Sequence, residues 1–212
     1  MNTTDKFYTL AKALLWLLGI SLSLNLMAKV KTEDWQQVKS ENNIVISVAA
    51  ASSGYSWIKA KTRLSGEPTD LVSLLNNTAV AEQWIDNCKK VEILETSSPN
   101  EVVVRTVFNA PWPVKDREML TRSILTIDPE TGRITIKIED ASSYLPSPSK
   151  LVRMQHISGE WQLQPVEDGH YEVIYIGYGE PAGNMPAWIA NEMLVSSMMT
   201  TFKNMQKQLQ PI

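Results

Sequence analysis

The chain has 212 residues, of which 43% are hydrophobic and 20% are charged, the composition of an ordinary globular protein with a sizeable core. Its net charge of −3 and its lack of a basic stripe exclude a nucleic-acid-binding surface. Its one cysteine, Cys88, excludes an internal disulfide, and we expect it to be a small buried side chain. We expect a single domain over residues 29–212.

Residues 1–28 have the order of a secretory signal. Lys6 and Lys12 precede an apolar run at 13–20, and small and polar residues follow as far as Ala28. The apolar run is short for a membrane span. We therefore expect a cleaved signal and export, either to a periplasm or out of the cell. An uncleaved membrane anchor and a buried amphipathic helix are the alternatives.

The next part of the chain predicts short elements. Thr32 is a suitable N-cap for a first helix, and a turn at 52–54 joins two strand patterns. Polar residues at Asn77 and Thr78 separate two further helical patches. The pattern predicts, in order, a helix over 32–39, a hairpin of strands 43–51 and 55–64, and helices over 69–76 and 79–85.

A series of strands then follows in quick succession. Turn signals at 128–132, 158–159 and 167–169 separate several of them. Such close spacing predicts an antiparallel meander. The expected strands are 88–95, 101–108, 117–127, 133–140, 150–157, 160–166 and 170–178.

Residues 185–209 predict one long amphipathic helix. Pro186 suits its first turn, because the N–H that proline lacks has no partner there. Apolar residues recur at steps of three, four and seven, as on one face of a helix. They are Trp188, Val195, Met198, Met199, Phe202, Met205 and Leu209. Antiparallel strands followed by one helix predict an α+β fold, with the sheet folded around the helix.

Two motifs lie in the order and at the spacing of a known family. Residues 111–118 read Pro-Trp-Pro-Val-Lys-Asp-Arg-Glu, and residues 183–191 read Gly-Asn-Met-Pro-Ala-Trp-Ile-Ala-Asn. The first resembles the signature PWPVSDRD, with Lys115 for Ser and Glu118 for Asp. The second is similar to the entry to a final helix, GxxPxWLxN. With weaker matches at 53–59, 80–87, 153–156 and 161–165, the chain resembles the StAR-related lipid-transfer (START) domain, a helix-grip fold, over roughly residues 35–209.

The resemblance implies a function without covalent chemistry. It implies that a lipid is bound in a tunnel capped by the last helix and is transferred between membranes, with that helix as the lid. We expect a phospholipid, a sterol or another apolar ligand, a transient membrane surface as partner, and a monomer without cofactor or metal. Some relatives that carry sterols or phospholipids bury a charge pair in the tunnel. Val104 and Ser123 stand at those positions here, which argues against sterol specificity.

The family picture and the period-two faces of the strands give a set of expected lipid contacts. For each apolar member the alternative is ordinary core, because lining and core have the same sequence pattern. Asn87 and Ser123 are polar, so a ligand hydroxyl or a trapped water would be their partner. The set is Trp84, Asn87, Val104, Phe108, Ser123, Trp161, Tyr175, Leu194, Met198, Phe202 and Met205.

Three arginines near this set are expected to have other roles. Arg105 and Arg122 are each one residue from a cavity position, so they should point outward. Arg117, in the signature run, is expected to form a structural salt bridge with Asp116 or with a carboxylate across the sheet.

An enzyme is the less favoured hypothesis. His156 and His170 lack metal-ligand spacing, and the chain has no Gly-x-Ser-x-Gly elbow. The glycines at 177–183 fit a strand end and a turn better than a dinucleotide site. A cyclase or hydrolase on the same fold, acting on a small aromatic or polyketide substrate, and a filled-core interaction domain are the two alternatives.

Overall fold

The computed structural model describes residues 34–110, 112–147 and 150–210. The predicted signal or anchor at 1–28, the predicted N-cap Thr32 and Pro111 of the signature run lie outside the described residues. Within the described ranges, no helix combines the length and the apolar character needed to cross a membrane.

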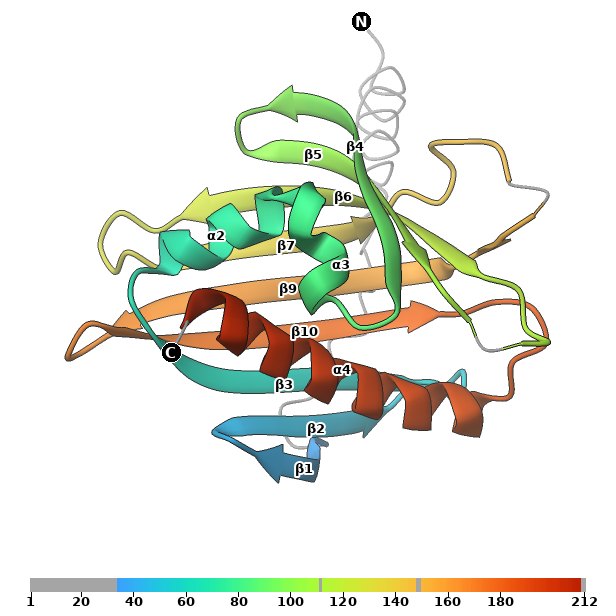
Figure 1. Ribbon diagram of the computed structural model, residues 1–212, viewed down its shortest axis with the longest axis horizontal. Coiled ribbons are helices and arrows are strands. Elements are labelled where there is room, and N and C mark those ends of the chain that lie inside the picture. The colour runs from blue at the N-terminus through green and yellow to red at the C-terminus, as the bar shows by residue number, and fades with distance from the viewer. Residues whose placement is uncertain (1–33, 111, 148–149, 211–212) are drawn as a thin grey trace, which may run out of the picture. The chain divides into compact units, whose positions relative to one another are not determined.

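A long antiparallel sheet organises the described chain (Figure 1). Its strand order is β1-β2-β3-β10-β9-β7-β6-β5-β4, and β8 pairs with β6 in parallel. The strands are β1 (Gln36–Glu41), β2 (Ile44–Ala50), β3 (Ser56–Ser65), β4 (Cys88–Ser98), β5 (Glu101–Phe108), β6 (Arg117–Ile127), β7 (Ile134–Asp140), β8 (Val152–Arg153), β9 (Gln155–Val166) and β10 (His170–Glu180).

The helices lie on one face of this sheet (Figure 1). They are α2 (Pro68–Asn76), the 3₁₀ turn η1 (Thr78–Val80), α3 (Ala81–Trp84) and α4 (Ala187–Leu209). The first turn of α2 is fixed by a capping box, in which the Asp70 carboxylate accepts the Glu67 N–H at 2.9 Å. The long helix α4 packs on β2, β3 and α3. The fold is therefore α+β, a curved antiparallel sheet around a long C-terminal helix, as the sequence predicts.

The core follows from the two periodicities of the sequence. Alternation along β3 places Ile58, Ala60 and Leu64 on the inner face, where each is almost fully buried. The three buried residues of α4, Met199, Phe202 and Met205, recur at helical spacing and pack against the same cluster. The C-terminal half of α4 is thus built into the core.

Most of the predicted elements are confirmed within a few residues. The hairpin, the two short helices after it and the long helix all form. So do the strands predicted at 88–95, 101–108, 117–127, 133–140 and 170–178.

The helix predicted over 32–39 is wrong, since residues 36–41 form strand β1. Every residue of β1 is exposed, so this segment has no apolar face that a helix could bury. Instead it pairs its backbone with β2, from Gln36 opposite Val48 to Glu41 opposite Ile44. The backbone hydrogen bonds offered by the edge of β2 outweigh the local helical pattern.

The turn predicted at 158–159 is also wrong, because β9 runs through it without a break. Gly159 pairs with Gly177 on β10, and a Cβ on Gly159 would lie 3.2 Å from the Ile176 carbonyl oxygen. Glycine at 159 therefore marks crowding between strands rather than a reversal of the chain. The strand predicted at 150–157 is divided into β8 and the first residues of β9.

One member of the predicted apolar helix face is misplaced. Trp188 is 70% exposed, whereas Met199, Phe202 and Met205 are buried. Trp188 stands in the first turn of α4, and the residues that contact the core begin further along the helix. Helical spacing alone does not tell where along a long helix its packing partner begins.

Candidate functional site

A cavity of about 290 Å³, the inner cavity, lies beneath α4. Aromatic and aliphatic side chains make most of its wall, so it suits an apolar guest. Five elements supply the expected residues in it: Trp84 from α3, Phe108 from β5, Trp161 from β9, Tyr175 from β10, and Leu194 and Met198 from α4.

A second cavity of about 310 Å³, the mouth cavity, lies beside the N-terminal half of α4. Its wall includes Tyr55, Asn87, Arg117 and Met193. It shares Asp86, Phe108, Met154, Gly179, Leu194 and Ser197 with the inner cavity. The mouth cavity and the inner cavity are therefore neighbours, and these shared residues form the wall between them.

A third cavity of about 170 Å³, the far cavity, lies between α2 and strands β4 to β7. Val104 and Ser123 line it, and Trp84, Ile138 and Trp161 belong to both its wall and that of the inner cavity. The three cavities thus follow one another, with Trp84 and Trp161 at one partition and Phe108 and Leu194 at the other.

Nine of the eleven expected lipid contacts line at least one of these cavities. Phe202 and Met205 are not among the lining residues; both are fully buried in the core. The rings of Phe202 and Trp161 stack at 5.8 Å, and Trp161 lies 4.6 Å from Tyr175. Phe202 therefore supports a wall residue from behind rather than forming the wall.

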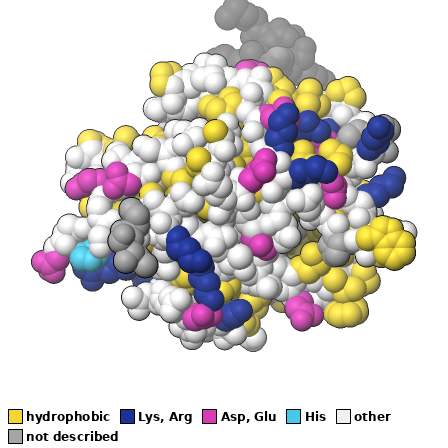
Figure 2. All heavy atoms as spheres, in the orientation of Figure 1, with side chains coloured by type: hydrophobic (Ala, Val, Ile, Leu, Met, Phe, Trp, Pro, Cys, Tyr) yellow, Lys and Arg dark blue, Asp and Glu magenta, His cyan; other side chains and the backbone are white. Residues whose placement is uncertain are grey.

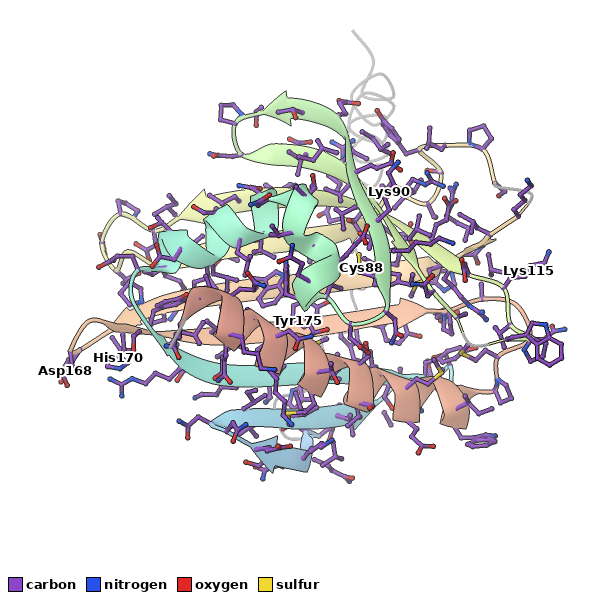
Figure 3. The ribbon with its side chains drawn as sticks, in the orientation of Figure 1. Cys88, Lys90, Lys115, Asp168, His170 and Tyr175 are labelled. Carbon is purple, nitrogen blue, oxygen red and sulfur yellow. The ribbon has the colours of Figure 1, made fainter. Side chains whose placement is uncertain are left out.

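One polar group in the wall of the apolar cavities has no protein partner within the described chain. The indole N–H of Trp84, which lines the inner and far cavities, makes no hydrogen bond. Burial raises the pKa of Tyr175 to about 12, and Figure 3 shows this residue between α4 and the sheet. Its ring folds over Gly177, where a Cβ would lie 2.5 Å from the hydroxyl. A polar guest atom would find a donor at Trp84.

Asn87 does not have the predicted environment. It is exposed, its φ is 56°, and its side-chain amide donates to the Asp86 carboxylate at 2.6 Å. It lines the mouth cavity rather than the apolar interior. Asparagine tolerates the left-handed backbone conformation at this bend. The presence of Asn at position 87 is therefore explained by the turn and not by a polar contact inside the cavity.

The outward orientation predicted for two arginines agrees with the strand faces. Val104 and Ser123 line the far cavity, whereas Arg105 and Arg122 line none of the three cavities. Arg105 donates to the buried Glu118 carboxylate at 2.8 Å, and this hydrogen bond is the main reason why its pKa is raised. Arg153 binds the other oxygen of the same carboxylate.

Arg117 differs from the prediction, because no described carboxylate pairs with it. Asp116 instead accepts hydrogen bonds from Lys89 at 2.9 Å and from the Ala110 N–H at 3.1 Å. The Arg117 side chain is 6% exposed and donates one hydrogen bond, to the Lys115 carbonyl. Burial lowers its pKa, and the nearby Asp116 charge opposes that shift.

Sequence reasoning missed several wall residues. Ile136 and Ile138 on β7, and Thr106 and Thr121 on β5 and β6, follow the period-two faces and were within reach of that signal. Met154 was not, because it stands in the short connection between β8 and β9.

The described residues contain no group of three or more His, Cys, Asp or Glu side chains that could hold a metal ion.

The sequence profile of the START domain matches residues 21–211. An uncharacterised protein of Pseudomonas aeruginosa is 25% identical over 175 residues, which cover 82% of this chain and 86% of that protein. The phosphatidylcholine transfer protein of Bos taurus is 23% identical over 146 residues, 68% of each chain.

Solved structures agree with this match. A STAR-related lipid transfer protein from Xanthomonas axonopodis superposes with a TM-score of 0.77 at 25% identity, covering 84% of this chain and 99% of the other. Human StAR-related lipid transfer protein 5 gives a TM-score of 0.75 at 14% identity, with coverage of 98% and 96%. The second likeness shows the fold.

Proposed function

The chain belongs to the START domain family, and on that premise we propose that it binds a lipid in an internal tunnel and transfers it between membranes without altering it. The observation that carries the proposal is the inner cavity, an apolar space between the sheet and α4. The tunnel would form when side chains at the two partitions move and join the mouth, inner and far cavities.

The driving force for binding is the burial of alkyl groups. Each CH₂ removed from water contributes about 0.8 kcal/mol. A lipid tail is therefore far more stable in an apolar tunnel than in water, whereas tunnel and bilayer are nearly equivalent to it. This near-equivalence allows both uptake and release, as transfer requires.

We place the gate in the N-terminal half of α4. The C-terminal half is held by the buried Met199, Phe202 and Met205 and by a 2.6 Å ion pair from Lys203 to Glu41. The N-terminal half has no residue in that buried set, and its polar anchor is Asn191, which binds the backbone of the β2–β3 turn. Few buried contacts are typical of segments that open locally.

The surface near the gate suits a membrane. Trp112 is 92% exposed and Trp188 is 70% exposed, and Figure 2 shows hydrophobic side chains gathered at the end of the molecule where α4 begins. Exposed indoles are favoured at membrane interfaces, where one end of the ring is apolar and the other is wet. We propose that this end contacts the bilayer transiently.

Mass spectrometry tests the proposal directly. The full chain, purified and extracted with organic solvent, should release a lipid, or should take up a lipid that carries a fluorescent acyl chain. A folded protein that does neither would contradict the function. Turnover of an aromatic substrate without lipid uptake would favour an enzyme instead.

We also propose export, on the pattern of Lys6, Lys12 and the apolar run at 13–20. N-terminal sequencing of the protein from the exported fraction of its host should find a start near residue 29. A chain that keeps residues 1–28 and partitions with membranes would favour the anchor.

A further inference from the structure

Arg117 places a cation in the wall of the mouth cavity without a described countercharge. Its side chain is 6% exposed, its Nε has no hydrogen-bond partner, and its one described hydrogen bond is to the Lys115 carbonyl. An arginine stays protonated in proteins, and an unpaired buried charge is costly. A guanidinium has five donors, so most of its capacity to bind a ligand is unused.

Neighbouring carboxylates are held by other partners. Asp116 binds Lys89 and the Ala110 N–H. Glu118 accepts from Arg105 and Arg153 on the far side of the same strand. Asp86 lines the mouth cavity too, but its carboxylate accepts from the Asn87 amide, and it forms no ion pair with Arg117.

The position of Arg117 sets the orientation of an amphiphilic guest. The mouth cavity shares the walls Phe108, Met154 and Leu194 with the apolar inner cavity. An alkyl tail in the inner cavity would leave the polar end of the same molecule in the mouth cavity. The Arg117 guanidinium lines the mouth cavity, so it is positioned to bind that polar end.

We propose that Arg117 binds an oxyanion, a phosphate or a carboxylate, at the polar end of the lipid, so that the ligand is an acidic amphiphile. This inference rests on the proposed lipid-binding function. Guanidinium and oxyanion geometries match, and such charge-assisted hydrogen bonds are among the strongest in proteins. The Asp86 carboxylate opposes the anion from the same cavity and should weaken its binding.

Two lipids with identical fluorescent acyl chains test it on the full chain: phosphatidic acid and diacylglycerol, which differ by the phosphate. The wild-type protein should bind phosphatidic acid about tenfold or more tightly than diacylglycerol, as expected for a charge-assisted contact. Arg117→Gln should remove the preference while diacylglycerol still binds, and Arg117→Lys should keep part of it. Asp86→Asn should strengthen the preference.

The matched control is Arg122→Gln, on the same strand but outside the three cavities. Arg122→Gln should keep the wild-type preference for phosphatidic acid. Loss of that preference in Arg122→Gln would overturn its assignment to Arg117. Binding of inorganic phosphate is measured as well, to test whether the site takes a free anion instead of a lipid. If phosphate binds through Arg117 while the two lipids bind equally, the site takes a free anion and the lipid assignment is wrong.

The affinities of the wild-type protein for phosphatidic acid and for diacylglycerol test the proposal even if Arg117→Gln does not fold. Equal affinity for the two lipids would overturn the role of Arg117 and leave lipid binding standing. Binding of neither lipid would overturn the function and this inference together.

Discussion

At the scale of single residues, the wall of the inner cavity is built from side chains at regular positions of the strands and of α4, and Arg117 is a charged residue in the wall of the neighbouring mouth cavity. Trp161, Tyr175 and Met198 follow from strand and helix periodicity, and all three line the inner cavity. Phe202 has the same pattern but lies behind the wall, because periodicity identifies an inward face and not whether a void borders it. The sequence predicts a salt bridge for Arg117, because sequence alone does not show that the Asp116 carboxylate binds Lys89.

A charge in the inner cavity should prevent lipid uptake. Met198→Arg would place an unpaired guanidinium among apolar side chains, which costs about 3 kcal/mol or more and should weaken uptake at least about 100-fold. Gln208→Arg adds the same charge at an exposed position of α4 and serves as control. Titration with a fluorescent lipid measures both, and unchanged uptake by Met198→Arg would remove this side chain from the wall.

The buried phenol of Tyr175 predicts sensitivity to alkali. Its pKa is raised to about 12, so the folded protein holds this proton more tightly than the unfolded chain does. The stabilisation is complete below the ordinary tyrosine value of 10.0 and is lost as pH rises towards 12. Denaturant unfolding of wild type and Tyr175→Phe between these pH values should show the smaller loss in the variant. Tyr171, whose pKa is also raised to about 12, keeps some sensitivity in both.

At the scale of elements, the long helix was the strongest sequence signal and the edge strand was the weakest. The helix at 185–209 combines length, spacing and a proline start, and the structure confirms it as α4. Strand β1 has no buried residue, so its sequence carries no strand periodicity. Its pairing with β2 is a tertiary effect that local pattern cannot supply.

A reversible crosslink tests α4 as the gate. A Cβ on Gly54 would lie 3.7 Å from the Cβ of Ala187, within the range of about 3.5–4.5 Å for a disulfide. Gly54→Cys with Ala187→Cys should exchange lipid at least about tenfold more slowly when oxidised than when reduced, because the gate cannot move.

The redox comparison uses one protein, so strain from cysteine at the Gly54 φ of +86° affects both arms. Cys88 should compete poorly, because it is buried and burial raises the pKa of its thiol. The single variant Ala187→Cys is the control for oxidation. Equal exchange rates in the two redox states would place the gate elsewhere.

At the scale of the whole molecule, the fold class and the family were predictable from the sequence, whereas the number and the volumes of the cavities were not. The motifs at 111–118 and 183–191 identify the family, and the succession of strands followed by one helix gives the architecture. The division of the interior into three cavities depends on the rotamers of Trp84, Phe108 and Leu194. No local pattern encodes how side chains from distant elements leave space.

Membrane contact should affect transfer and not binding. Replacing Trp112 and Trp188 by Ser removes two exposed indoles, so transfer between vesicles should slow while affinity for a monomeric lipid stays the same. Val166→Ser, at an exposed apolar residue of β9, is the control. Transfer that stays at the wild-type rate would exclude these two residues from docking.

The central claim is that a lipid tail occupies the space beneath α4. The most direct measurement is anomalous X-ray scattering from crystals of the full chain with a lipid brominated along its acyl chain. We predict bromine peaks in the inner cavity, between Trp161, Tyr175 and Met198. Bromine on the outer surface alone, with the interior closed by protein side chains, would contradict it.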